Sequence, residues 1–72
     1  MEVDFVLYGE KGIIAVEVKR SSRIDESALR GLKAFKTDYP LSRCVLAYGG
    51  ERKAWFGNIE AIPLSDFLKN PF

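Results

Sequence analysis

The chain has 72 residues, of which 47% are hydrophobic and 29% charged, and its formal net charge is +1. This length allows one domain, the apolar fraction argues against disorder, and the balanced charge by itself indicates no partner. Histidine is absent and Cys44 is the single cysteine, which excludes Ser-His and Cys-His catalysis, the usual zinc sites and an internal disulfide. A free cysteine is typical of proteins in a reduced cytosol. No apolar run approaches the ~18 residues of a membrane span, and the N-terminus does not have the pattern of a signal peptide. We therefore expect a cytoplasmic protein that does not enter a membrane.

Two strands are predicted at residues 2–8 and 13–20, joined by a short turn that begins at Gly9 and ends at Gly12. If Gly9 faces Gly12, strand alternation separates the side chains into two faces. One face is wholly apolar and carries Val3, Phe5, Leu7, Ile14, Val16 and Val18. The other is half apolar and half charged, and carries Glu2, Asp4, Val6, Tyr8, Ile13, Ala15, Glu17 and Lys19. Both faces are expected to be covered, at least in part.

The same register places two carboxylates opposite each other, because Asp4 falls across from Glu17. Facing residues have Cβ atoms roughly 4.5–5.5 Å apart, and like charges there are destabilising. Glu2 would face Lys19, which lies diagonally from Asp4. A divalent cation between Asp4 and Glu17 would remove the repulsion. The alternative interpretation is a solvated sheet face on which Lys19 balances two acids.

A helix is predicted from the N-cap Asp25 to about Asp38, with Glu26 in its first turn and Pro40 ending the element. Residues at 3.6 spacing form its apolar stripe, namely Ala28, Leu32, Phe35 and Tyr39, with Leu29 beside them. The other side carries Arg30, Lys33 and Lys36, for which a solvated helix face is the favoured interpretation.

A third strand is predicted at residues 43–48, parallel to residues 13–20, because a helix between two strands indicates a crossover connection. Short strands at 54–56 and 59–62 and a helical turn at 63–68 complete an α/β fold. The remaining large apolar residues are expected in the core or at an interface, and these are Trp55, Phe56, Phe67, Leu68 and Phe72.

Asp4, Glu17 and Lys19 together suit metal-assisted phosphodiester hydrolysis. Two carboxylates can hold Mg²⁺, with Mn²⁺ as a substitute, while the ion keeps waters and binds substrate phosphate. The metal lowers the pKa of a bound water, and a lysine beside it can neutralise developing negative charge. Arg20 and Arg23 follow directly and are candidate contacts to DNA phosphates. Ser21 and Ser22 are expected in turn and capping roles rather than as nucleophiles.

The order of these residues resembles the PD-(D/E)xK nuclease superfamily, in which an acid is followed one hairpin later by a Glu-Val-Lys-type segment, a helix and a strand. Six segments resemble one branch more closely: Glu-Val-Asp-Phe-Val, Glu-Val-Lys-Arg-Ser-Ser, Leu-Arg-Gly-Leu-Lys-Ala-Phe, Tyr-Pro, Tyr-Gly-Gly and Ile-Pro-Leu-Ser-Asp-Phe-Leu. They are similar to the C-terminal domain of uncharacterised prokaryotic AAA-type P-loop ATPases. The resemblance implies a restriction-endonuclease-like mixed sheet with a β-hairpin–α–β core and a site at Asp4, Glu17 and Lys19.

Two features differ from that family pattern: there is no Walker A sequence, and no helix precedes the first strand. We therefore expect residues 1–72 to be a single truncated nuclease-like domain, either a fragment or a shortened gene product, accessory to a P-loop ATPase domain or subunit. A core this small rarely gives more than ~3–5 kcal/mol, so a homodimer is expected for the isolated chain. Two alternatives stay open, a non-catalytic module for assembly or DNA contact and an inactive product stable only as a dimer.

Overall fold

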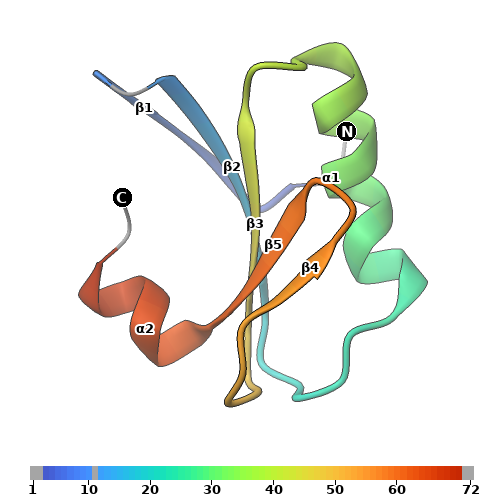
Figure 1. Cartoon of the computed structure of the whole chain (residues 1–72), viewed down its shortest axis with the longest axis vertical. Coiled ribbons are helices and arrows are strands. Elements are labelled where there is room, and N and C mark those ends of the chain that lie inside the picture. The colour runs from blue at the N-terminus through green and yellow to red at the C-terminus, as the bar shows by residue number, and fades with distance from the viewer. Residues whose placement is uncertain (1–2, 11, 71–72) are drawn as a thin grey trace.

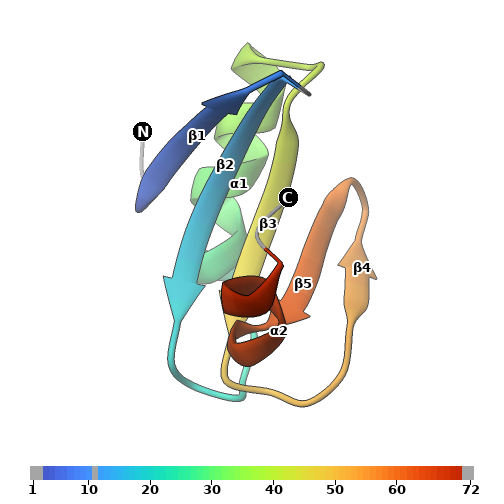
Figure 2. The ribbon, with the colours of Figure 1, turned by 90° about the vertical axis from the view of Figure 1, so that its left-hand side faces the viewer.

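The computed structural model describes residues 3–10 and 12–70 and folds into one sheet with a helix on each face (Figures 1 and 2). In chain order the elements are β1 (Phe5–Gly9), β2 (Gly12–Lys19), α1 (Glu26–Asp38), β3 (Arg43–Tyr48), β4 (Ala54–Phe56), β5 (Ile59–Pro63) and α2 (Leu64–Lys69). The strands form a mixed sheet in the order β1-β2-β3-β5-β4. The predicted α/β class is confirmed.

β3 lies at the centre of the sheet. It runs parallel to β2, to which it is connected through α1, and parallel to β5, while β1 and β4 pair antiparallel at the two edges. The predicted hairpin register is confirmed, because Phe5 pairs with Val16 and Gly9 with Gly12. Gly12 has a φ of 114°, a conformation that glycine adopts readily, and it closes the tight turn.

Side-chain alternation divides the core into two layers, one on each face of the sheet. The layer under α1 contains Ala15, Leu46, Tyr48, Ile59 and Ala61 from the strands and Ala28, Leu29, Leu32 and Phe35 from the helix. The layer on the α2 side contains Ile14, Val16, Val45, Ala47, Ile62 and Phe67. The predicted cover on both faces and the predicted helix stripe are thus confirmed, except at Tyr39. That residue caps the C-terminus of α1, is half exposed, and lies against Phe35 with ring centroids 4.7 Å apart.

The chain departs from the predicted alternation just before β1. Asp4 donates its backbone N–H to the carbonyl oxygen of Val16 at 3.0 Å, although Val16 already pairs with Phe5. Asp4 and Phe5 therefore both lie opposite Val16, and two residues opposite one is the arrangement of a β-bulge. The bulge turns Val3 into the α1 layer, where Val6 also packs, so the predicted place of Val3 beside Phe5 is wrong.

The bulge also changes the start of the first strand. The ladder begins at Phe5 rather than at residue 2, so the predicted rung of Asp4 directly across from Glu17 is not part of the pairing. Glu2, which was predicted to face Lys19, lies outside the described residues. The other predicted boundaries agree with the structure to within one residue.

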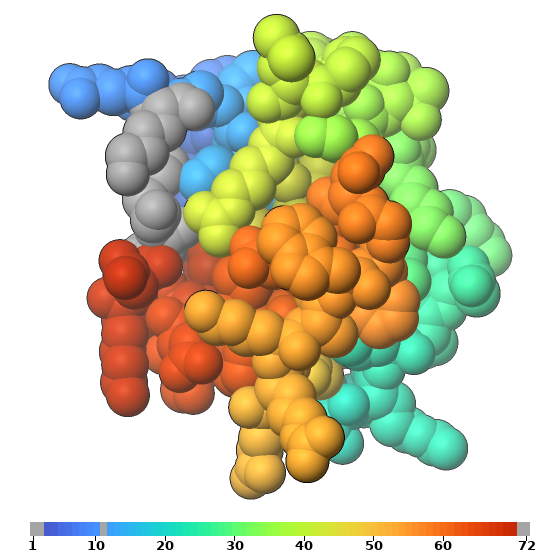
Figure 3. Space-filling model, viewed as in Figure 1, coloured from blue at the N-terminus to red at the C-terminus, as the bar shows by residue number. Residues whose placement is uncertain are grey.

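The predicted core or interface residues of the C-terminal third have different environments. Phe67 is buried in the α2 layer, and Phe56 packs at the border of the α1 layer. Trp55 and Leu68 are 65% and 69% exposed, so they do not belong to the core of this chain. Figure 3 shows the β4–β5 hairpin at the near surface of the molecule. Phe72 lies outside the described residues.

The segments that leave β2 and β3 touch each other at one end of the sheet (Figure 1). Gly49 donates its N–H to the carbonyl oxygen of Ser21 at 3.0 Å. A Cβ atom at position 49 would lie only 2.0 Å from the carbonyl oxygen of Arg20. The two backbones therefore approach as closely as they do because residue 49 has no side chain.

Within the described ranges, no helix is long and apolar enough to cross a bilayer.

Candidate functional site

The candidate site lies at the carboxyl end of β2, next to the carboxyl end of β3. Glu17 pairs with Leu46 and Lys19 with Tyr48 across the parallel ladder. Because side chains alternate along a strand, Glu17 and Lys19 point to the same face as Ala15, which is the face covered by α1. Ligands of open α/β sheets bind at this edge, outside the carboxyl ends of the parallel strands.

Asp4 reaches the site through a backbone contact. Its Oδ2 atom accepts the N–H of Val18 at 2.6 Å, and Val18 is the residue between Glu17 and Lys19. The pairing of β1 with β2 ends at Val16, so β1 offers no backbone carbonyl to the N–H of Val18. The Asp4 carboxylate supplies that acceptor instead. A charged acceptor makes this a stronger bond than the backbone bond it replaces. The structure thus brings Asp4 to the Glu17–Lys19 segment, through the bulge and not through a paired rung.

Glu17 is half-buried in β2, while Asp4 is exposed at the sheet edge. Within the described residues, 3–10 and 12–70, no group of three or more His, Cys, Asp or Glu side chains is arranged to hold a metal ion.

Lys19 is held by a residue that the sequence identified only as a helix cap. The Lys19 Nζ atom lies 2.9 Å from Oδ2 of Asp25. The other oxygen of Asp25 accepts the backbone N–H of Ala28 at 3.0 Å and the hydroxyl of Ser27 at 2.8 Å, which confirms the predicted N-cap. One carboxylate oxygen of Asp25 therefore binds the first turn of α1, and the other binds Lys19 at the end of β2. Opposite charges flanking a strand-to-helix connection were the only sequence signal for this pair.

These contacts lower the pKa of Asp25 far below its ordinary range. The largest cause is the hydrogen bond from Lys19, followed by those from the Ala28 backbone and the Ser27 hydroxyl. All three favour the ionised carboxylate.

A pH dependence of stability follows from this lowered pKa. An acid whose pKa is depressed on folding stabilises the fold above its unfolded value, about 3.9, and that contribution disappears as the pH falls toward the folded value. Urea unfolding between pH 6 and pH 2 is therefore expected to show a steeper acid loss of stability for the wild type than for Asp25→Asn. Equal slopes for the two proteins would contradict the assignment. Because Asp25 is exposed, the difference is expected to shrink at high salt.

The predicted phosphate contacts, Arg20 and Arg23, lie exposed in the segment between β2 and α1. Arg23 donates its backbone N–H to Oγ of Ser21 at 3.0 Å, which confirms a turn role for Ser21. Contact of either arginine with DNA stays a prediction.

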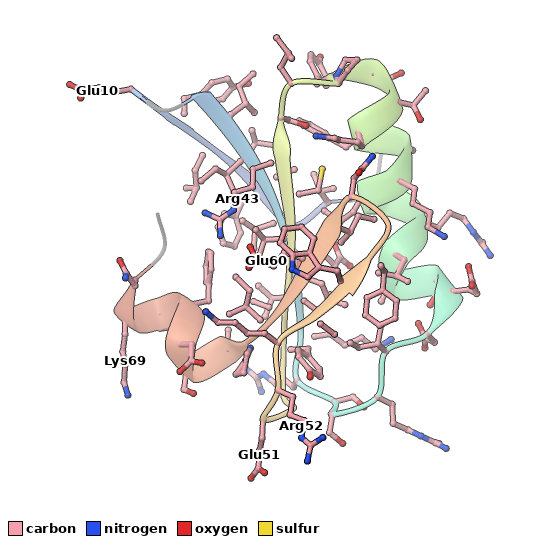
Figure 4. All side chains as sticks on the ribbon, in the orientation of Figure 1. Glu10, Arg43, Glu51, Arg52, Glu60 and Lys69 are labelled. Carbon is pink, nitrogen blue, oxygen red and sulfur yellow. The ribbon has the colours of Figure 1, made fainter. Side chains whose placement is uncertain are left out.

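Three further basic side chains, Lys33, Lys36 and Arg43, have local partners. Lys33 lies 3.8 Å from Glu26, and Lys36 donates to the carbonyl oxygen of Ser42, as a solvated helix face allows. On the opposite face of the sheet, Arg43 binds Glu60 across β3 and β5 at 2.7 Å (Figure 4). None of these contacts joins the candidate site.

The fold and site define a small α/β domain, in which a mixed sheet carries a charged cluster at the end of an inner parallel strand. The chain belongs to the family described as a domain of unknown function, DUF4143, which it matches over residues 1–67. No curated protein and no solved structure matches the chain. The family assignment covers nearly the whole sequence and states no activity.

Proposed function

We propose that this domain provides a nuclease-type site for Mg²⁺-dependent hydrolysis of DNA phosphodiester bonds and acts beside a P-loop ATPase domain or subunit. The observation that carries the proposal is the 2.6 Å hydrogen bond from Val18 N–H to Asp4, since Val18 separates Glu17 from Lys19. Two acids and one ammonium thereby share a small surface at the end of β2. The resemblance to PD-(D/E)xK nucleases supports the same three residues.

The donor set suits a hard divalent cation. Mg²⁺ in phosphoryl-transfer sites is held by one or two carboxylates and keeps waters and substrate phosphates as its other ligands. Asp4 is exposed, and its bond to Val18 engages one of two carboxylate oxygens. Asp4 and Glu17 would hold the ion. When bound, such an ion supplies an acidified water and stabilises negative charge on the phosphoryl group.

The cationic side chains have separate roles in the proposal. Lys19 carries three N–H donors, so it can keep one on Asp25 and present another to a phosphate oxygen, where it neutralises developing charge. Arg20 and Arg23, exposed immediately after β2, bind the neighbouring phosphates and position the DNA backbone. Val18 anchors the segment, because its side chain packs in the α2 layer.

Cation binding tests the proposal directly. In calorimetric titrations with Mn²⁺, we expect Asp4→Asn and Glu17→Gln each to weaken binding by about tenfold or more, which corresponds to ~1.4 kcal/mol. Asp4→Asn keeps an oxygen that can accept from Val18, so the fold should be retained. Asp38→Asn, at the far end of α1, is the matched control and should leave the affinity unchanged.

Cleavage of plasmid and branched DNA in Mg²⁺ is the second measurement, and it should be lost in the same two variants. A wild-type chain that binds no Mn²⁺ and cleaves neither substrate would overturn the proposal.

A non-catalytic assembly or DNA-contact module is the second candidate. It is favoured by the structural partners of the site residues, since Asp4 binds a backbone N–H and Lys19 binds a helix cap. Exposed aromatic side chains on both edge strands also favour it, with Tyr8 77% exposed on β1 and Trp55 on β4. Under this alternative, DNA processing by the native assembly survives Asp4→Asn and Glu17→Gln, while Trp55→Ala weakens association in sedimentation experiments.

A further inference from the structure

We propose that the crevice between the β2–α1 connection, residues 20–25, and the β3–β4 connection, residues 49–53, binds a phosphate group of a DNA strand through Arg52 and Ser22. The proposed function names only Arg20 and Arg23 as phosphate contacts, so this inference adds a second segment to the DNA-binding surface. It rests on the DNA-binding part of the proposed function and involves no bound cation.

The two connections touch at the carboxyl ends of β2 and β3 (Figure 1). Gly49 donates its N–H to the Ser21 carbonyl oxygen at 3.0 Å, and residue 49 has no side chain to keep the Arg20 carbonyl away. Beside this contact lies an open crevice of about 470 Å³, a volume within the range of ligand sites. Its lining is formed by Ser22, Tyr48, Gly49, Gly50, Glu51 and Arg52.

The β3–β4 connection is held in a defined shape by Tyr48. The Tyr48 hydroxyl donates to the carbonyl oxygen of Arg52. A Cβ atom at Gly50 would lie 2.2 Å from the Tyr48 ring, so the chain packs directly against that ring. Tyr48 is itself buried in the α1 layer. The backbone that carries Arg52 is therefore positioned without a ligand, which lowers the cost of ordering it on binding.

The two connections are more basic than the chain as a whole, whose net charge is only +1. They contain two acidic side chains and four basic ones, namely Arg20, Arg23, Arg52 and Lys53. One of the two acids, Asp25, is paired with Lys19. Among residues 3–10 and 12–70, no ion pair uses any of the three arginines. A guanidinium without an acidic partner suits a phosphate, to which it can donate two parallel N–H bonds.

Ser22 and Glu51 complete the polar lining of the crevice. The predicted turn role is filled by Ser21, whose Oγ accepts the Arg23 N–H, and the exposed Ser22 hydroxyl can donate to a phosphate oxygen. Glu51 is exposed at the same end of the molecule as Arg52 (Figure 4), and its charge opposes an anion. The crevice thus offers one cation, one neutral donor and one anion, and removing each should have a different effect.

Fluorescence anisotropy with a short labelled DNA duplex tests the assignment. Binding is measured on the full chain at several salt concentrations in EDTA, so that neither a divalent cation nor hydrolysis takes part. We expect Arg52→Gln to weaken binding about fivefold at low salt and to reduce the slope of log affinity against log salt by about 1, as for one lost phosphate contact. Ser22→Ala should weaken binding about threefold and leave the slope unchanged, because the hydroxyl is uncharged.

Arg30→Gln is the matched control, because Arg30 is also exposed but lies on α1 and does not line the crevice. It should change the affinity by less than about twofold. Arg52→Lys keeps the charge and should restore the salt slope. Glu51→Gln should tighten binding about twofold, because it removes the opposing charge. Circular dichroism checks folding, and both substitutions of Arg52 keep the backbone carbonyl that Tyr48 binds.

The outcomes are distinct. Equal weakening by Arg52→Gln and Arg30→Gln would mean that the duplex responds only to net charge, and the inference would be wrong. It would also be wrong if the wild type did not bind the duplex, or if AMP bound as tightly as the duplex, since the crevice would then be a site for free nucleotides. Failure of the proposed hydrolysis is separate. A chain that binds no Mn²⁺ and cleaves no DNA, but binds the duplex through Arg52, would remove the nuclease activity and retain the phosphate site.

Discussion

Replacing Gly49 by alanine is expected to lower the free energy of unfolding by about 3 kcal/mol or more, enough to unfold much of a domain of this size. The added Cβ atom would lie 2.0 Å from the carbonyl oxygen and 2.9 Å from the carbonyl carbon of Arg20. These are backbone atoms, so no side-chain rotation relieves the overlap. Moving the two segments apart would also break the hydrogen bond from Gly49 N–H to Ser21.

Urea denaturation followed by circular dichroism measures this loss. Gly57→Ala is the matched control, because Gly57 has a φ of 63° but nothing within 4 Å of the added atom. Its cost is the conformational strain alone, about 1–2 kcal/mol. If Gly49→Ala were no more destabilising than Gly57→Ala, the close approach of the two segments would be wrong.

Leu46→Ala is expected to have a similarly large effect through the core. Leu46 has 0% of its surface exposed and lies in the central strand β3, between β2 and β5 and under α1. Removing its three terminal carbons leaves a cavity that a central strand cannot close, and such substitutions cost about 2–5 kcal/mol. Thermal and urea unfolding should both show the loss.

The control for this substitution is Leu41→Ala in the turn before β3. Leu41 is fully exposed, so the same chemical change should alter stability by no more than about 0.5 kcal/mol. Equal destabilisation by the two variants would contradict the placement of Leu46 in the core.

Much of the fold could be predicted because its signals are local. Glycine at both ends of the turn set the hairpin register, and the apolar alternation of β2 left one consistent pairing. Asp25 marked the start of α1 through its capping chemistry, and Pro40 marked its end. The parallel placement of β3 followed from the helix between two strands.

The remaining features depend on contacts between distant segments. The bulge at Asp4 places Val3 under α1, and nothing in the alternation of the first strand indicated that an extra residue would be accommodated there. The ion pair of Lys19 with Asp25 required the start of the helix to return over the end of β2. Residue spacing singled out Asp4, Glu17 and Lys19 as a group, and the contacts of Asp4 with Val18 and of Lys19 with Asp25 were visible only in three dimensions.

The central position of β3 has a consequence for the order of folding. The β1–β2 hairpin and α1 are local units, whereas pairing Ile14 with Arg43 closes a loop that contains the rest of β2 and all of α1. Such long-range closure is entropically slow compared with hairpin or helix formation. Until β3 is inserted, β5 has no parallel neighbour and neither core layer is complete. We therefore expect assembly of the central strand, and not formation of the hairpin that carries the acids, to be the step that commits the chain to its native topology.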